Sequence, residues 1–253
     1  MPARTLSFYC HLNNRRNMNR HLLLISNSTN AGEAYLAWPK KDIEAFFKKF
    51  NIKRVLFVPY AGVASGYDAS AEKVGKVFAE MGVALDSVHA FEFPITAVQQ
   101  AECIVVGGGN TFHLVAEMHR TGLMEAIREK VLQGCPYMGW SAGSNVACPT
   151  MKTTNDMPII QPESFDTLNL VPFQINPHYL DANPAGHGGE TREDRIREFM
   201  VVNPDVYVVG LREATSLLVE GGKMELVGSR NMRLFKAGEE VREVSPGDVS
   251  FLL

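Results

Sequence analysis

One segment of the sequence, Gly139-Trp140-Ser141-Ala142-Gly143, has the residue types of a nucleophile elbow. The apolar run before it predicts a strand and the small residues after it predict a helix, so Ser141 would lie on a sharp turn. Flanking glycines suit such a turn, which strains the backbone and leaves no room for side chains. The hydroxyl would be exposed at a helix N-terminus, where the Ala142 N–H could point at an oxyanion. The alternative is that Ser141 is only the helix N-cap.

A second glycine-rich segment, residues 107–111, lies between the apolar run Ile104–Val106 and a helical pattern. Three successive glycines let the backbone approach a ligand and expose N–H groups at a helix start. The segment lacks the Gly-x-Gly-x-x-Gly spacing of a dinucleotide site and the lysine of a P-loop. We therefore expect Gly109 to supply a second oxyanion N–H, with Asn110 as a candidate substrate contact. A tight connection without a ligand is the alternative.

A nucleophilic serine needs a base, most often a histidine. The chain has seven histidines: His11, His21, His89, His113, His119, His178 and His187. His178 follows an apolar run at residues 171–175, which predicts a loop at a strand end, where ligands collect in open α/β sheets. His187 lies among glycines and suits a mobile flap. We predict that His178 is the base; a hydrogen-bonded loop histidine is the alternative.

The base needs a carboxylate that sets its tautomer. Asp156 is one candidate, and Glu213, just after the apolar run at residues 206–211, is the other. Each could also be an ordinary surface carboxylate. Chain order does not decide between them, because catalytic triads occur in several orders.

Arg192 breaks a rule of helix composition. It lies in the first turn of a predicted helix over residues 191–202, where the helix dipole disfavours a cation. A local rule broken without evident gain marks a functional candidate. A guanidinium group binds carboxylates through two hydrogen bonds, so Arg192 could hold a substrate carboxylate. The alternative is an exposed arginine paired with Glu190 or Glu193.

The elements that must position these residues alternate along the chain. Apolar runs at residues 22–25, 55–58 and Ile104–Val106 predict strands buried on both faces, with helical spacing between them. Thr191 and Asp194 form the capping pattern of the helix over residues 191–202. We predict one α/β catalytic domain over residues 20–253, a three-layer sandwich with a mostly parallel sheet and right-handed crossovers.

The end of the chain has a different character. Residues 206–211, 216–219 and 224–227 form short β-rich runs, separated by turn residues such as Gly-Gly and Gly-Ser. They predict antiparallel strands that close the same sheet.

The composition excludes several classes of protein. With 253 residues, 45% of them hydrophobic, the chain can bury a core. It has no run of eighteen apolar residues, so we expect no membrane span. Its net charge of −3 argues against a nucleic-acid partner.

The first residues differ from the rest. Residues 1–20 contain four arginines and no acidic residue, and we expect residues 1–19 to be a disordered basic extension. The four cysteines, Cys10, Cys103, Cys135 and Cys148, have no disulfide or metal spacing, and this favours free thiols in a cytoplasmic protein.

Six segments resemble, in the same order along the chain, the peptidase E family of serine peptidases, which is related to cyanophycinase. The resemblance runs from about Arg20 to about Gly238. The segments are Ser-Asn-Ser-Thr at 26–29, Gly-Gly-Gly-Asn-Thr-Phe at 107–112, Gly-Trp-Ser-Ala-Gly at 139–143, Thr-Thr-Asn-Asp-Met-Pro-Ile at 153–159, Gln-Ile-Asn-Pro-His at 174–178 and Gly-Glu-Thr-Arg-Glu at 189–193.

The resemblance implies a fold like that of class I glutamine amidotransferases, with Ser141 where those enzymes carry cysteine. It implies hydrolysis of dipeptides that begin with aspartate, with Ser141 as nucleophile and His178 as base. The N–H groups of Gly109 and Ala142 match the oxyanion donors, and Arg192 matches the arginine that holds the aspartyl side chain.

The third triad member is the point at which the resemblance leaves alternatives. In the family this role has been assigned both to the acid that matches Asp156 and to the one that matches Glu213. Arg212 and Ala214 flank Glu213, in place of the proline and glycine that usually flank that glutamate, so the turn presenting Glu213 could differ here.

Together these observations predict a cytoplasmic α-aspartyl dipeptidase, a serine exopeptidase without metal or cofactor, acting as a monomer or homodimer on small peptides with N-terminal aspartate. Glu190 could bind the free α-amino group. The rivals are a cyanophycinase-like peptidase or esterase of the same fold, and a non-catalytic module that binds small molecules. A glutamine amidotransferase is disfavoured because no cysteine lies at the elbow.

Overall fold

The computed structural model describes residues 19–183, 185–186 and 188–253. The predicted extension at residues 1–19 falls almost entirely outside these residues, and so does His187. Among the described residues, no helix is both long and apolar enough to cross a membrane.

An eight-stranded sheet forms the centre of the molecule, in the order β12-β9-β8-β1-β5-β4-β2-β3. The five strands from β1 to β3 in this order are parallel, and β8, β9 and β12 are antiparallel. The strands are β1 (His21–Ile25), β2 (Arg54–Val58), β3 (Ala84–Ser87), β4 (Ile104–Val106), β5 (Tyr137–Trp140), β8 (Thr215–Glu220), β9 (Lys223–Gly228) and β12 (Gly247–Asp248).

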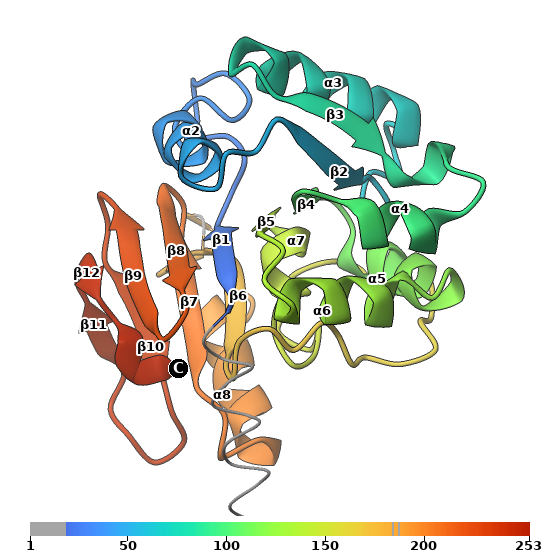
Figure 1. Cartoon of the computed structure of the whole chain (residues 1–253). Helices are drawn as coiled ribbons and strands as arrows, with labels where there is room; N and C mark the ends of the chain where they lie inside the picture. Colours follow the sequence, from blue (N-terminus) through green and yellow to red (C-terminus); the bar gives the residue numbers. More distant parts are fainter. Residues whose placement is uncertain (1–18, 184, 187) are drawn as a thin grey trace, which may run out of the picture.

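Helices cover both faces of this sheet, and this confirms the predicted three layers. Figure 1 shows α2 and α3 on one side of the sheet and α4, α5 and α6 on the other. The helices are α2 (Lys40–Lys49), α3 (Tyr67–Glu80), α4 (Pro94–Gln100), α5 (Thr111–Arg120), α6 (Leu123–Leu132), α7 (Ala142–Asn145) and α8 (Arg192–Val202), with 3-10 turns η1 (Val88–Ala90) and η2 (Ser250–Leu252).

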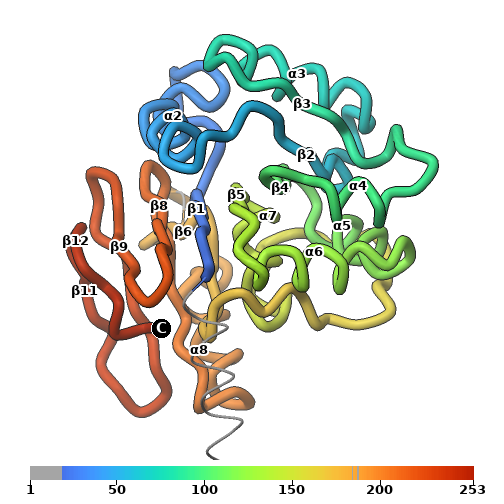
Figure 2. The backbone as a smooth tube through the Cα atoms, in the orientation of Figure 1, coloured from blue at the N-terminus to red at the C-terminus, as the bar shows by residue number. Residues whose placement is uncertain are grey.

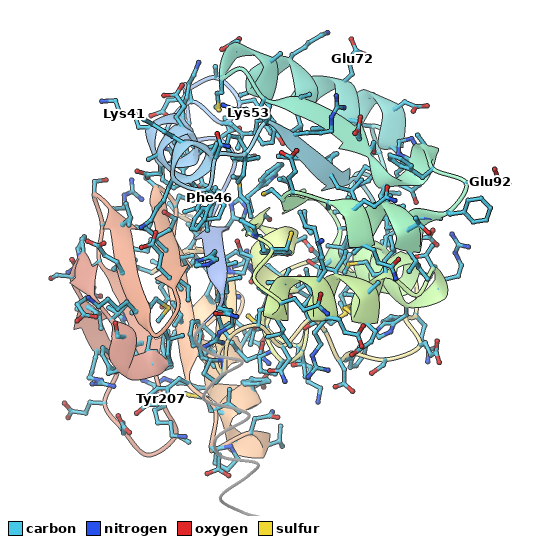
Figure 3. All side chains as sticks on the ribbon, viewed as in Figure 1. Lys41, Phe46, Lys53, Glu72, Glu92 and Tyr207 are labelled. Atoms are coloured by element: carbon cyan, nitrogen blue, oxygen red, sulfur yellow. The ribbon has the colours of Figure 1, made fainter. Side chains whose placement is uncertain are left out.

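The continuous apolar strands have a clear physical cause, since successive side chains point to opposite faces of a sheet. Leu22 and Leu24 pack into one hydrophobic cluster, with α5 and α6, whereas Leu23 and Ile25 pack into the other, with α2 and α3. Figure 3 labels Phe46 of α2, which is buried in this second cluster. A parallel strand covered on both faces therefore cannot alternate apolar and polar residues.

A second sheet corrects the prediction for the end of the chain. It has the order β11-β10-β7-β6, with β6 (Gln174–Tyr179), β7 (Val208–Arg212), β10 (Met232–Phe235) and β11 (Arg242–Val244). The run predicted at residues 206–211 as an antiparallel strand of the main sheet is β7, which lies in this second sheet, antiparallel to β10 and parallel to β6. A continuous apolar run indicates that a strand is buried, but it does not indicate which strand it pairs with. The sequence pattern alone therefore could not assign this strand to a sheet.

A long segment without regular helix or strand connects α7 to β6, as the tube in Figure 2 shows. It lies against α5, where the rings of Phe112 and Phe165 pack edge to face and His119 Nε2 lies 2.9 Å from the Asp166 carbonyl oxygen. This segment brings Asp156 to the N-terminal end of α5, where Thr111 is the first residue of the helix.

Candidate active site

Ser141 lies on the turn between β5 and α7, in a strained backbone conformation with φ 53° and ψ −113°. A positive φ is unfavourable for a residue with a Cβ and is typical of functional sites. The flanking glycines are required by close contact, because a Cβ on Gly139 would lie 2.3 Å from the Gly143 carbonyl oxygen, and one on Gly143 2.1 Å from that of Val106. The Ser141 side chain makes no N-cap hydrogen bond, so the simple capping alternative does not describe it.

His178 lies within strand β6 and not in the loop that the sequence predicted. The register of β6 against β7 shifts between Pro177 and Tyr179, and His178 occupies this bulge with φ 52°. A bulge redirects a side chain out of the regular alternation of a strand. Here it brings His178 Nε2 to 3.0 Å from Ser141 Oγ.

The buried hydroxyl of Ser26, at the end of β1, holds this bulge in place. Ser26 Oγ accepts a hydrogen bond from the His178 N–H at 3.0 Å and donates one to the Leu211 carbonyl at 2.7 Å. Ser26 thus links the two sheets at the site. Its motif carried the family resemblance, but sequence reasoning assigned it no function.

Glu213 lies in the two-residue connection between β7 and β8, where the chain passes from one sheet to the other. Its Oε1 atom is 2.9 Å from His178 Nδ1. The preceding residue, Arg212, forms ion pairs with Asp181 and Glu243, which fasten the end of β7 and raise the pKa of the guanidinium further above its usual value.

The next residue, Ala214, adopts the conformation that a glycine would take more easily, with φ 62°. Its N–H donates to Asn27 Oδ1 at 3.0 Å, so the turn is held although this sequence lacks the glycine of the family pattern. The turn that presents Glu213 is therefore held with backbone strain at Ala214.

We expect Ala214→Gly to raise the free energy of unfolding by about 0.5–1 kcal/mol, since glycine removes the strain but costs more conformational entropy on folding. Urea denaturation would measure the change. The matched control is Ala79→Gly on the exposed face of α3, which should lower stability by about 0.5–1 kcal/mol. A destabilised Ala214→Gly variant would contradict the assignment of strain.

Asp156, the competing third member, contacts other residues. Its Oδ2 atom accepts hydrogen bonds from the Thr111 N–H at 2.8 Å, from the Thr111 hydroxyl and from the Thr154 hydroxyl at 3.0 Å. None of its hydrogen bonds within the described residues reaches His178. The geometry therefore places Glu213, and not Asp156, beside the imidazole.

Two cavities meet at Ser141 and His178, which line both. The smaller cavity has a volume of about 380 Å³ and contains Asp156 and Arg192. The larger has a volume of about 530 Å³ and is bordered by the glycine loop at residues 107–109. A substrate whose reacting carbonyl lies at Ser141 could thus extend into a cavity on either side.

Arg192 begins α8 as predicted, after a capping box made by Thr191 and Asp194. The acids expected to neutralise it have other partners: Glu190 lies near Arg195, and Glu193 pairs with Arg197 and Arg233.

The guanidinium of Arg192 is half-buried. Burial lowers its pKa from the usual value, and Arg195 lowers it further, whereas Asp156 raises it. Arginine stays charged in spite of such shifts, so the smaller cavity contains a cation with no hydrogen-bonded acid among the described residues.

Glu190, which the sequence predicted to bind the free α-amino group, lines neither cavity. Its side chain is exposed, contacts Arg195 at 3.7 Å and is not among the residues that line either cavity. The acid that lies with Arg192 is Asp156, brought there by a segment distant in sequence. Glu190 is close to Arg192 along the chain, but its exposed side chain contacts Arg195 instead.

The glycine loop lies directly against the nucleophile. A Cβ on Gly108 would be 3.0 Å from Ser141 Cβ, and one on Gly109, which has φ 137°, would be 2.1 Å from the Ala61 carbonyl oxygen. In the part of the chain that the structure describes, the N–H groups of Gly109 and Ala142 donate to no protein atom. Both remain candidates for oxyanion donors.

Asn110 is the N-cap of α5, which sequence reasoning did not foresee. Its Oδ1 accepts from the His113 N–H at 3.0 Å and its Nδ2 donates to the Met157 carbonyl at 2.9 Å. Although Asn110 lines the larger cavity, its side chain fastens the loop to the Asp156 segment, and this disfavours the predicted substrate contact.

No group of three or more histidine, cysteine or acidic side chains suited to a metal ion occurs among the described residues. The three cysteines that the structure describes, Cys103, Cys135 and Cys148, are buried free thiols, as predicted.

Comparison with known proteins shows the family of this chain. The model of peptidase family S51 matches residues 22–227. Peptidase E of a Nostoc species is 53% identical over 237 residues, which cover 93% of this chain and 98% of that protein. Peptidase E of Salmonella typhimurium is 45% identical over 227 residues, covering 89% and 98%.

A solved structure shares the fold at low sequence identity. The crystal structure of a peptidase from an acI-B1 actinobacterium is 16% identical, with a TM-score of 0.62 over 90% of this chain and 98% of that one. Since the family model covers most of the chain and the relatives match over nearly their full lengths, this chain belongs to peptidase family S51 and is a serine-type peptidase.

Proposed function

We propose that this protein is an α-aspartyl dipeptidase, which hydrolyses dipeptides with an N-terminal aspartate through Ser141, His178 and Glu213. The observation that carries the proposal is the hydrogen-bonded series Ser141 Oγ, His178 Nε2, His178 Nδ1 and Glu213 Oε1, with separations of 3.0 and 2.9 Å. It opens onto a cavity that contains an arginine. The curated relatives named peptidase E support the same reading.

In this mechanism Ser141 Oγ attacks the peptide carbonyl while His178 Nε2 takes its proton. Glu213 accepts a hydrogen bond from His178 Nδ1–H and thereby keeps Nε2 unprotonated and aimed at the serine. His178 then gives the proton to the leaving amine as the peptide C–N bond breaks. A water molecule hydrolyses the acyl-enzyme by the same steps.

The negative charge of the tetrahedral intermediate requires hydrogen-bond donors, and we assign them to the N–H groups of Gly109 and Ala142. Ala142 N–H lies at the start of α7, directly after the nucleophile. Preorganised donors of this kind are typically worth about 10²–10³ in rate each.

The smaller cavity supplies the specificity. Arg192 would bind the aspartyl carboxylate, and burial strengthens this pairing because less water screens the two charges. Asp156 lies in the same cavity and is suited to the free α-amino group, the function that the sequence had suggested for Glu190. One cation and one anion would thus bind the two charged groups of an N-terminal aspartate.

Arg192→Met is expected to lower kcat/KM for Asp-Leu by about 10³-fold and to affect Asn-Leu by less than tenfold, because only the aspartyl substrate loses a charged partner. Steady-state kinetics on the two dipeptides would measure this. The wild-type enzyme should itself prefer Asp-Leu to Asn-Leu, Glu-Leu and N-acetyl-Asp-Leu.

The matched control is Arg195→Met, one helical turn further along α8, where the side chain is exposed and lines neither cavity. It should leave the preference for Asp-Leu unchanged. Equal losses on Asp-Leu and Asn-Leu in Arg192→Met would remove Arg192 from the specificity site. Absence of Asp-Leu turnover by the wild type would refute the proposed function and favour another serine hydrolase.

We also propose a cytoplasmic location. Cys103, Cys135 and Cys148 are unpaired, and burial raises the pKa of each thiol. Free thiols of this kind are the normal state in a reducing compartment.

A further inference from the structure

The larger cavity beside Ser141 takes no part in the proposed recognition of aspartate. We propose that it binds the residue released by hydrolysis, with its wall of aromatic rings accepting an apolar side chain and Lys73 binding the free C-terminal carboxylate. This inference rests on the proposed function, since it assumes that the aspartyl side chain occupies the smaller cavity with Arg192.

The nucleophile lies between the two cavities. Ser141 and His178 line both cavities, so the reacting carbonyl lies at their junction. With the aspartyl residue in the smaller cavity, the leaving residue must extend from the carbonyl carbon on the other side. The space there is about 530 Å³ and is bordered by the glycine loop at residues 107–109.

One wall of the larger cavity is aromatic. Phe57 stacks on Trp140 with ring centroids 6.1 Å apart, and Tyr35 packs edge-on against Trp140 at 6.4 Å. Trp140 directly precedes Ser141, so these three rings form a wall that begins at the nucleophile. Such a wall suits a large apolar side chain such as that of leucine or phenylalanine.

The charged residues of the larger cavity indicate the kind of ligand that it binds. No aspartate or glutamate is among the residues that line it, and Lys73 is the single lysine or arginine among them. In a protein with net charge −3, a cavity that contains a lysine and no acidic residue favours an anionic ligand.

Lys73 is held at the cavity by an aromatic ring and not by an acid. Its Nζ atom lies 3.9 Å from the centroid of the Tyr35 ring, a cation–π contact that fixes the ammonium group without neutralising it. Other lysines of this region do have acidic partners: Lys76 pairs with Glu72 and Lys40 with Glu80. Lys73 makes no ion pair within the described residues, so its charge is available to a ligand.

The chemistry of the reaction accounts for this arrangement. A dipeptide differs from a longer peptide in that its second residue ends in a carboxylate, close to the bond that is cleaved. A cation on the leaving side therefore selects dipeptides over amidated or extended substrates. Recognition of that carboxylate would make the enzyme a dipeptidase, whereas Arg192 makes it specific for aspartate.

The test compares kcat/KM for Asp-Leu and for its amide, Asp-Leu-NH₂, in the wild type, Lys73→Met and Lys73→Arg. The wild type is expected to prefer Asp-Leu by about tenfold, which is typical of a hydrogen bond to a charged group. Lys73→Met should bring the ratio close to one by losing activity on Asp-Leu alone, and Lys73→Arg should keep most of the preference. Lys76→Met, on the same helix but outside the cavity, is the matched control.

The outcomes separate this inference from the function on which it rests. If the wild type cleaves Asp-Leu and Lys73→Met keeps the wild-type ratio of the two substrates, the assignment of Lys73 is wrong and the dipeptidase remains. Equal losses on both substrates would likewise reject carboxylate recognition, because a merely structural change affects the amide as well. If the wild type cleaves neither substrate, both proposals fall.

Discussion

Replacement of Ser141 by alanine is expected to abolish hydrolysis of Asp-Leu, with a loss in kcat of at least about 10⁴-fold, as is typical of nucleophile removal in serine peptidases. The reason is that no other hydroxyl lies within hydrogen-bonding distance of His178 Nε2 among the described residues. Initial rates at saturating Asp-Leu would measure the loss. Alanine should also tolerate the positive φ at this position no worse than serine, so the variant should fold.

Ser144→Ala is the matched control for this experiment. Ser144 is buried in α7, where its hydroxyl donates to the carbonyls of Ile25 and Gly139. Its removal should cost about 1 kcal/mol of stability and leave kcat within a few-fold of the wild type. Turnover that survives in Ser141→Ala at wild-type levels would rule out Ser141 as the nucleophile.

The second large effect is expected for Glu213. Glu213→Gln should lower kcat by about 10⁴-fold, because an amide can stabilise the wrong imidazole tautomer while preserving the shape of the site. Asp156→Asn should instead act mainly on KM, since Asp156 lies with Arg192 and does not contact His178 within the described residues. Separate values of kcat and KM for both variants would measure this difference.

The opposite result would reassign the third triad member. If Asp156→Asn lost kcat as severely as predicted for Glu213→Gln, and Glu213→Gln kept near wild-type kcat, Asp156 would be the residue that orients His178. Thermal unfolding of both variants is the necessary control. The turn with Ala214 at φ 62° and the hydrogen bonds of Thr111 and Thr154 to Asp156 are both structural elements that a substitution could disturb.

Several features of this protein followed from the sequence alone because their causes are local. Continuous apolar runs predicted β1, β2, β4 and β5, since a strand buried on both faces has apolar residues throughout. The glycines around Ser141 predicted the strained elbow, because only residues without a side chain fit where Gly139 and Gly143 contact other backbone atoms. Thr191 and Asp194 predicted the start of α8, since a capping box involves four successive residues.

Tertiary structure decided the features that depend on distant parts of the chain. Asp156 and Glu213 were equivalent in sequence, and only the passage of the chain between the two sheets puts Glu213 beside His178. The bulge at His178 depends on Ser26, which is 152 residues away along the chain. Asp156 joins Arg192 because the segment after α7 packs against α5, whereas Glu190, its near neighbour in sequence, does not reach the cavity. Sequence patterns report burial and local backbone geometry, but pairing between distant segments depends on which surfaces pack together, and the site lies where the two sheets meet.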